Sequence, residues 1–169
     1  NYVDLPEFFE DNLKEWMTGF LGAIRYKTNV AKLLGDEERP GVVHKLQKNV
    51  CMVLTLYATK YDEEFSAFLD GFVESVWQLL NESLTANLAK HDSIVAHGVA
   101  FLTAVANGAH HKLFGNGNIM KSICEKIVIP CIMLRKEDVE LFDDDPSEYV
   151  RRDIEGSDLD TRRRSAKEL

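Results

Sequence analysis

The sequence has few of the residues that interrupt helices or cross-link a chain. Its 169 residues include only four prolines, ten glycines and three cysteines. An odd number of cysteines with no C-x-x-C pair excludes a complete disulfide framework and gives no support to a zinc site. Cys51, Cys124 and Cys131 each lie in an apolar pattern, and the seven-residue spacing of the last two puts them on one helix face. We expect all three to be reduced thiols packed in the core.

Long apolar runs and positive charge are also scarce. The longest apolar run, from Ile127 to Leu134, is far shorter than the roughly 18 residues that a membrane span requires, and no signal-peptide pattern opens the chain. Lys and Arg number 20 against 28 Asp and Glu, which gives a net charge of -8 and a pI near 5.1. Such a surface repels nucleic acids and anionic membranes. We therefore expect neither as a partner, and a basic protein instead.

Strand patterns are missing: no stretch alternates with a period of two, and no hairpin dipeptide joins two such stretches. Apolar residues recur instead at spacings of three and four, which predicts five helices and the start of a sixth. Asp4 and Asp62 are the expected caps of the first and third helices. The predicted helices are Pro6 to Arg25, Val42 to Tyr57, one after Asp62, one after Ser93, one from Asn118, and one beginning near Thr161.

These helices predict an all-α fold of about three helix pairs, the number at which a solenoid begins to bury its faces. We expect the second and third helices, and the third and fourth, to form antiparallel pairs within a single domain spanning 1–169. Trp16 and Trp77 lie in the apolar stripes and are expected to fill the core between helices. Pro130 removes a backbone donor, so it should kink or end the fifth helix close to Ile127.

An acidic insert at about 135–159 separates the last two predicted helices. From Glu137 to Asp160 it holds eleven carboxylates against only Arg151 and Arg152. That composition is typical of a solvated loop. Apolar residues such as Phe142 and Tyr149 favour the alternative, a segment that docks onto the solenoid or onto a partner. The candidate partner-binding residues are Asp143, Asp144, Asp145, Glu148, Tyr149, Arg151, Arg152, Asp153 and Glu155.

A helix start follows the insert. Ser157 stands three residues before Asp160, which is the S-x-x-D form of a capping box, and Asp158 is a further acceptor for the free amides of the sixth helix. We assign Ser157, Asp158, Asp160 and Arg162 as structural capping residues.

No motif for chemistry is organised along the chain. His110 and His111 with His97 could be drawn as a metal or acid–base cluster, but no carboxylate is fixed near them by the sequence. The glycines of Gly115 to Asn118 precede a helix but lack the Lys-Ser/Thr of a P-loop, so a turn is the better interpretation. We expect no enzyme, no cofactor and no metal.

Three stretches carry a resemblance to a known family. They are DLPEFFEDN at Asp4 to Asn12, LYATKYDEEF at Leu56 to Phe65, and VELFDDDPSEYVRRDIEGSDLDTRRR with the residues that follow to Ala166. Together they resemble the importin-alpha re-exporter family of the karyopherins. Within the third stretch, Asp158 to Arg162 is similar to the D-x-x-V-R signature of a HEAT repeat.

The resemblance implies a HEAT-type superhelix from the middle of a nuclear export receptor. Such a receptor binds Ran-GTP and importin alpha and shuttles between nucleus and cytoplasm. The alternatives are a HEAT scaffold outside nuclear transport, which has no reason to carry the third stretch, and an all-helical enzyme. Because the chain opens at Asn1 and closes early in its last helix, we expect a fragment with exposed end faces that self-associates.

Overall fold

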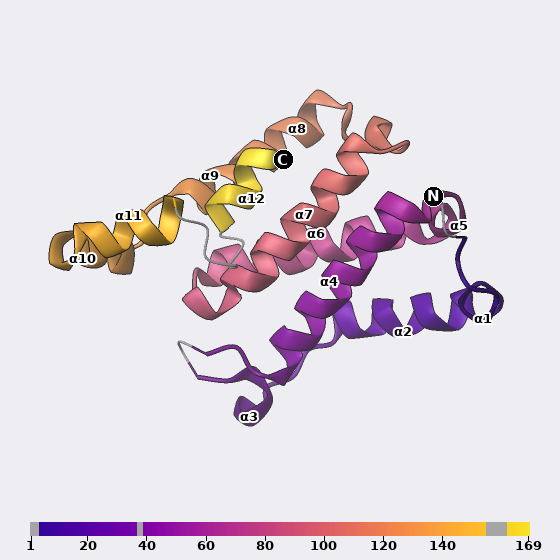
Figure 1. Cartoon of the computed structure of the whole chain (residues 1–169), viewed down its shortest axis with the longest axis horizontal. Helices are drawn as coiled ribbons and strands as arrows, with labels where there is room; N and C mark the ends of the chain where they lie inside the picture. The colour runs from indigo at the N-terminus through magenta and orange to yellow at the C-terminus, as the bar shows by residue number, and fades with distance from the viewer. Residues whose placement is uncertain (1–3, 37–38, 155–161) are drawn as a thin grey trace.

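A computed structural model of the chain (Figure 1) describes residues 4–36, 39–154 and 162–169, and the side chains of 31–32 and 152–154 are outside this description. Within those ranges the backbone is almost wholly helical, and the one β-type pairing is an isolated bridge between Gly35 and Pro40. The all-α prediction is therefore confirmed. The helices are α1 (Glu7–Asp11), α2 (Leu13–Arg25), α3 (Ala31–Leu34), α4 (Val42–Lys60), α5 (Asp62–Phe65), α6 (Leu69–Ala86), α7 (Asp92–Asn107), α8 (Gly117–Ile123), α9 (Ile129–Ile132), α10 (Lys136–Asp144), α11 (Pro146–Ile154) and α12 (Arg162–Glu168).

The long helices stack in two layers, as in a solenoid. One layer consists of α4, α7 and α12, with α7 in contact with both neighbours, and the other consists of α2, α6 and the α8–α9 stretch. Figure 1 shows α4 and α7 running side by side and α10 and α11 projecting at one end. The expected packing of α6 on α7 is confirmed. The expected pairing of α4 with α6 is wrong, because α4 packs chiefly along α7 and, within the third predicted helix, it is the short α5 that contacts α4.

The core lies between the two layers and is rich in aromatic rings. Phe65 stacks on Phe72 with ring centroids 5.5 Å apart and meets the edge of Phe101 at 6.4 Å. All three are at most 1% exposed. Gly98 of α7 faces Leu80 of α6 so closely that an added Cβ would lie 2.9 Å from a leucine methyl carbon. A side chain at this position would force the buried Leu80 side chain to shift.

The first predicted helix is broken in two at Asn12, whose backbone leaves the helical region and whose side-chain amide donates to the Phe8 carbonyl at 2.8 Å. This break separates α1 from α2. Trp16 is 38% exposed rather than buried, so its expected core position is wrong, whereas Trp77 is half-buried against the core. Neither α1 nor α5 has a side-chain cap, so Asp4 and Asp62 do not act as predicted.

Pro130 interrupts the fifth predicted helix as expected. Before it the backbone widens into a π-helical turn, Cys124–Val128, in which the amide of Ile129 donates to the carbonyl of Cys124. One extra residue in a turn shifts the helix register by about 100°. Cys124 is consequently exposed while Cys131 is fully buried, and the prediction that the two share a face and both pack in the core is wrong for Cys124.

Candidate functional site

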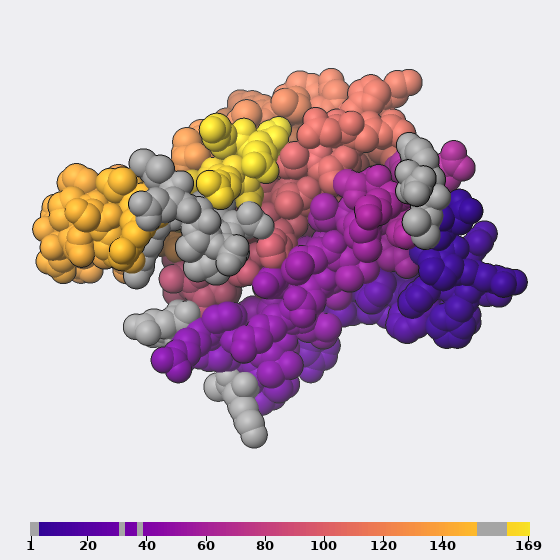
Figure 2. Space-filling view, in the orientation of Figure 1, coloured from indigo at the N-terminus to yellow at the C-terminus, as the bar shows by residue number. Residues whose placement is uncertain are grey.

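The described part of the acidic insert is a helical hairpin, α10–α11, and not a loop. Its two helices pack on each other, with the ring of Phe142 edge-on to Tyr149 at a centroid distance of 5.4 Å. The carboxylate of Asp138 accepts from the backbone amide of Arg135 at 2.8 Å and so caps the start of α10. In Figure 2 the hairpin forms a separate lobe beside the stacked layers. The apolar residues noted in the sequence thus serve in part to hold the hairpin together.

Arg135 ties the base of this hairpin to the start of α7. Its guanidinium donates two hydrogen bonds to the carboxylate of Asp92, at 2.6 and 2.8 Å, which is the bidentate arrangement of a strong ion pair. Its Nε donates to the side chain of Asn87 at 2.8 Å. Asn87 ends α6 in the left-handed region at φ 50, a conformation that asparagine tolerates better than most residues. The Arg135 side chain therefore connects the start of α10 to the start of α7 in one layer and to the end of α6 in the other.

Arg162, the first residue of α12, is buried beneath the same base. Its guanidinium donates to the carbonyls of Pro130 at 3.2 Å and Met133 at 3.0 Å, both at the C-terminal end of α9. Free carbonyls at a helix C-terminus carry partial negative charge and favour a cation there. Arg162 is thus a capping residue, but it caps the end of α9 and not the start of its own helix.

Arg163 connects α12 to both helices of the hairpin. One of its amino groups donates to Asp138 of α10 at 2.6 Å and the other to the hydroxyl of Tyr149 of α11 at 3.3 Å. The guanidinium carbon also lies 5.9 Å from the centre of the tyrosine ring, within the range of a cation–π contact. The hairpin is consequently held at its base from two sides, by α7 and by α12.

Positive charge exceeds negative charge in this cluster, which we call the arginine cluster: Arg135, Arg162, Arg163, Asp92 and Asp138. Burial lowers the pKa of Arg162, and the neighbouring Arg135 lowers it further, while the two carboxylates oppose the shift. The guanidinium nevertheless stays charged, because arginine does not lose its proton in proteins. The carbonyls at the end of α9 supply the acceptors that the carboxylates do not.

Comparison with known proteins assigns the family. A family model described as Cse1 matches residues 1–169. The chain belongs to the Cse1 family. It is 47% identical to Exportin-2 of Drosophila melanogaster over 171 residues and 43% identical to Exportin-2 of Homo sapiens over 170 residues. Each alignment covers 100% of this chain and 17% of the relative, so the chain spans about a sixth of the length of these proteins.

A solved structure agrees with the fold of this Cse1-family chain. The structure described as the exportin Cse1 in its cargo-free, cytoplasmic state superposes with a TM-score of 0.89 and 38% sequence identity. The match covers 99% of this chain and 18% of that one. The HEAT-type fold expected from the sequence is therefore confirmed.

The candidate residues of the insert that the structure describes lie at the tip and on α11 of the Cse1-family hairpin. Asp143 and Asp144 are exposed at the end of α10, and Asp145 joins the two helices. Glu148 and Arg151 form an ion pair on α11. Arg152 and Asp153 belong to α11, but their side chains are not described. Four further candidates lie outside the described residues: Glu155 and the proposed caps Ser157, Asp158 and Asp160.

Sequence reasoning missed most of the arginine cluster. Arg135, Asp92, Asn87 and Arg163 were assigned no role, because residues 25 to 48 positions apart give no pairing signal in one sequence. Only the capping of α10 had a local sign, since Asp138 follows Arg135 by three residues as in a capping box.

The histidines considered for chemistry form no recognisable site among the described residues. His110 lies 3.2 Å from the carboxylate of Asp62, a contact between distant segments. Among the residues that the structure describes, no group of three or more His, Cys, Asp or Glu side chains could hold a metal ion. No helix in the described ranges is long and apolar enough to cross a membrane.

Proposed function

We propose that this chain is a HEAT-repeat segment of a nuclear export receptor, which binds Ran-GTP and carries importin alpha from the nucleus to the cytoplasm while shuttling between the two. The observation that supports this function is identity above 40% to Exportin-2 over the whole chain. The net charge of -8 fits a basic cargo. A receptor of this kind acts by binding and carries out no chemical reaction.

Within this function, the α10–α11 hairpin is the proposed contact with a partner. Asp143, Asp144 and Asp145 are exposed at its tip. Val139, Phe142 and Val150 are 45 to 49% exposed. Exposed apolar side chains ringed by carboxylates suit a protein partner with a basic rim. The remaining candidates would set the orientation of this contact. They are Glu148, Tyr149, Arg151, Arg152, Asp153 and Glu155.

The test uses the intact receptor that carries this segment, with Asp143→Lys and Asp144→Lys at the tip. Pull-down with Ran-GTP and importin alpha should weaken relative to the unaltered receptor, most clearly at low salt, where screening is least. The matched control is Glu63→Lys with Glu64→Lys, two neighbouring acidic residues on α5, far along the chain from the hairpin. Ran-GDP in place of Ran-GTP should abolish the complex in every variant.

Two different results of this pull-down would contradict the two proposals separately. If the unaltered receptor binds neither Ran-GTP nor importin alpha, the export function is wrong and a scaffold outside nuclear transport becomes the better assignment. If binding is normal in both charge-reversal variants, the export function stands and the hairpin is not the contact.

We also propose that the separate chain self-associates. Phe8, Phe9 and Trp16 are 64%, 40% and 38% exposed, and their rings form a ladder that continues to Phe20 with centroid distances of 5.6, 5.8 and 6.2 Å. A contiguous aromatic surface favours burial against another surface. Sedimentation should show mass rising with concentration, and Phe8→Ser with Trp16→Ser should restore the monomer. A strict monomer at high concentration would contradict this proposal.

A further inference from the structure

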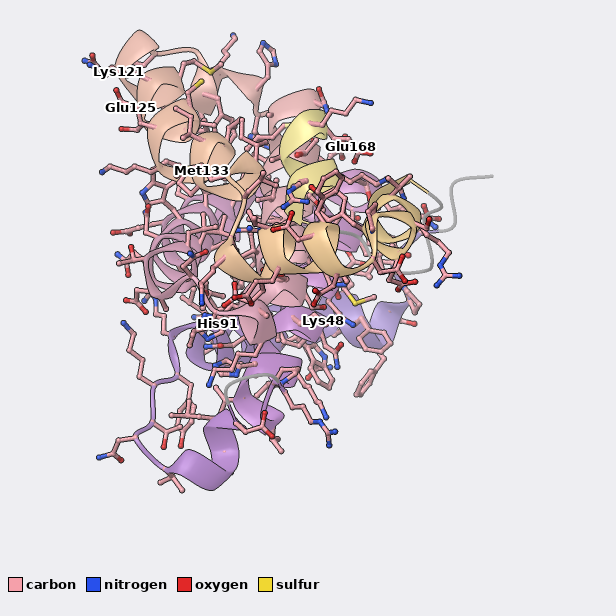
Figure 3. All side chains as sticks on the ribbon, turned by 90° about the vertical axis from the view of Figure 1, so that its left-hand side faces the viewer. Lys48, His91, Lys121, Glu125, Met133 and Glu168 are labelled. Atoms are coloured by element: carbon pink, nitrogen blue, oxygen red, sulfur yellow. The ribbon has the colours of Figure 1, made fainter. Side chains whose placement is uncertain are left out.

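A cavity of about 310 Å³ lies between the first two turns of α4 and the start of α7, and two of its lining residues, Lys90 and Ser93, flank Asp92 of the arginine cluster in the sequence. His44, Lys45, Lys48 and Asn49 line it from α4, Lys90 lines it from the 3-10 turn Ala89–His91, and Ser93 lines it from the first turn of α7. Figure 3, in which Lys48 and His91 are labelled, shows the elements that carry them below the α10–α11 hairpin. The cavity is open to a partner, because its lysines are exposed or half-buried.

The charge of this cavity is opposite to that of the chain. Among the residues that the structure describes, three lysines line it and no aspartate or glutamate does, although the whole chain has a net charge of -8. Lys45, Lys48 and Lys90 form no ion pair within the described ranges, whereas Lys27, Lys121 and Lys136 each pair with a glutamate. Unpaired lysines gathered in one hollow repel one another, and an anion placed among them relieves that repulsion.

The two helices that flank the cavity add to its positive potential. α4 has 19 residues and α7 has 16, and the lining residues lie in or next to the first two turns of α4 and the first turn of α7. The helices run in the same direction in Figure 1, so both N-terminal ends face the same region. Each helix N-terminus carries a partial positive charge, and the two contributions have the same sign as the lysines.

His44 lines the cavity, and its ring contacts that of His91, which is not among the lining residues. The rings of His44 and His91 meet edge to face with centroids 4.9 Å apart. Burial lowers the pKa of His44, and charge on His91 and Lys90 lowers it further. Burial also lowers the pKa of His91, which Lys90 and Arg135 reinforce while the Ser83 carbonyl and Asp92 oppose it. Both rings therefore favour the neutral form until negative charge enters.

We propose that this cavity binds a short acidic segment of a partner protein, with separate carboxylates pairing with Lys45, Lys48 and Lys90. The lysines stand on two different elements and end in single point charges, unlike the planar fork of arginine that holds one phosphate. Such an arrangement suits several carboxylates spread along a peptide. Asn49 and Ser93 offer neutral hydrogen-bonding groups beside them. This site is independent of the export function proposed above.

The experiment titrates the full chain with a fluorescent glutamate-rich peptide and follows anisotropy at about 0.05 and 0.3 M salt. The peptide should bind at low salt, and Lys48→Glu with Lys90→Glu should weaken it by about tenfold or more. Lys14→Glu with Lys60→Glu changes the net charge equally at exposed positions outside the cavity and should leave binding within about twofold. Proton NMR of the imidazoles should show the pKa of His44 and His91 rising when the peptide is bound, because a nearby carboxylate favours the charged ring.

Four outcomes would overturn the proposal. The peptide fails to bind at low salt, or both charge-reversal variants weaken it equally, which indicates diffuse attraction to the surface. The histidine pKa values stay unchanged on binding, which places the peptide elsewhere. Inorganic phosphate competes as strongly as the peptide, charge for charge, which identifies a small-anion site and not a peptide site.

Discussion

Replacing Arg135 with methionine tests whether the arginine cluster holds the hairpin to the solenoid. Methionine keeps much of the side-chain volume and removes the charge. The Arg135 side chain is only 9% exposed, and its loss removes the bidentate pair with Asp92 and the bond to Asn87. Removing one partner of a fully buried ion pair costs about 3–5 kcal/mol. Asp92 keeps 37% of its surface in water, so solvent compensates part of the loss and we expect about 2–3 kcal/mol.

The assay is thermal and urea unfolding of the full chain by circular dichroism. For a chain of this length, the expected loss corresponds to a fall in Tm of about 5–10 °C. Lys136→Met is the matched control, since Lys136 is the next residue, is exposed, and pairs with Glu140 of its own helix. Limited proteolysis with trypsin should also cut at Arg151 sooner in the Arg135 variant, because a loosened hairpin exposes its backbone.

A second substitution decides whether the pairing itself is responsible. Asp92→Asn leaves three guanidinium groups facing the single carboxylate of Asp138, so it should destabilise the chain more than Arg135→Met does. The double variant should cost less than the two single losses together, with a coupling of about 1–3 kcal/mol. If Arg135→Met is no less stable than Lys136→Met, or if the two losses simply add, the cluster does not hold the hairpin and the reasoning is refuted.

Three further outcomes are expected. The pKa values of His44 and His91 lie below the ordinary value of about 6.5, so the unfolded chain binds protons at a higher pH than the folded chain. The contribution of these residues to stability should therefore be full above about pH 6.5 and fall as the pH drops below it. Replacing both residues with glutamine should flatten this dependence of the unfolding free energy on pH, measured by urea titrations. Only Cys124 should react with iodoacetamide in the native chain at pH 8, since burial raises the pKa of the other two thiols to about 12 and about 11, and all three should react in guanidinium. Asp145→Ala should cost about 1 kcal/mol of unfolding free energy, whereas Asp144→Ala should cost almost nothing.

The hydrogen bond at Asp145 that underlies the last expectation also corrects a prediction made from the sequence. The sequence pattern was given no cap at Asp145, yet Asp145 accepts a hydrogen bond from the amide of Glu148 at 2.9 Å and caps α11. Asp145, Pro146 and Glu148 stand at the N-cap, first and third positions of that helix, which is a recognisable start signal. Charge reversal at Asp145 is therefore a change in stability as well as in surface charge, so it does not serve as a purely electrostatic test.

Apolar spacing predicted the helices well where one face is buried. α4, α6 and α7 follow their stripes closely because the stripes fill the core. The hairpin was missed because α10 and α11 bury little, and their charged faces have the composition of a solvated loop. Trp16 was misplaced for a related reason: an apolar stripe predicts a contact, but it does not say whether the contacting surface lies within the same chain.

The arginine cluster could not be predicted from one sequence, since its partners come from four helices and the turn that ends a fifth. Its position nevertheless separates two properties of the hairpin. The base is fixed by Arg135, Arg162 and Arg163, whereas the tip at Asp143 and Asp144 makes no contact with these arginines. Substitutions at the base should therefore change stability and hairpin position together, and substitutions at Asp143 and Asp144 should change partner binding alone. A variant series in which tip changes also destabilise the fold would show that the hairpin is a structural element of the solenoid and not its contact surface.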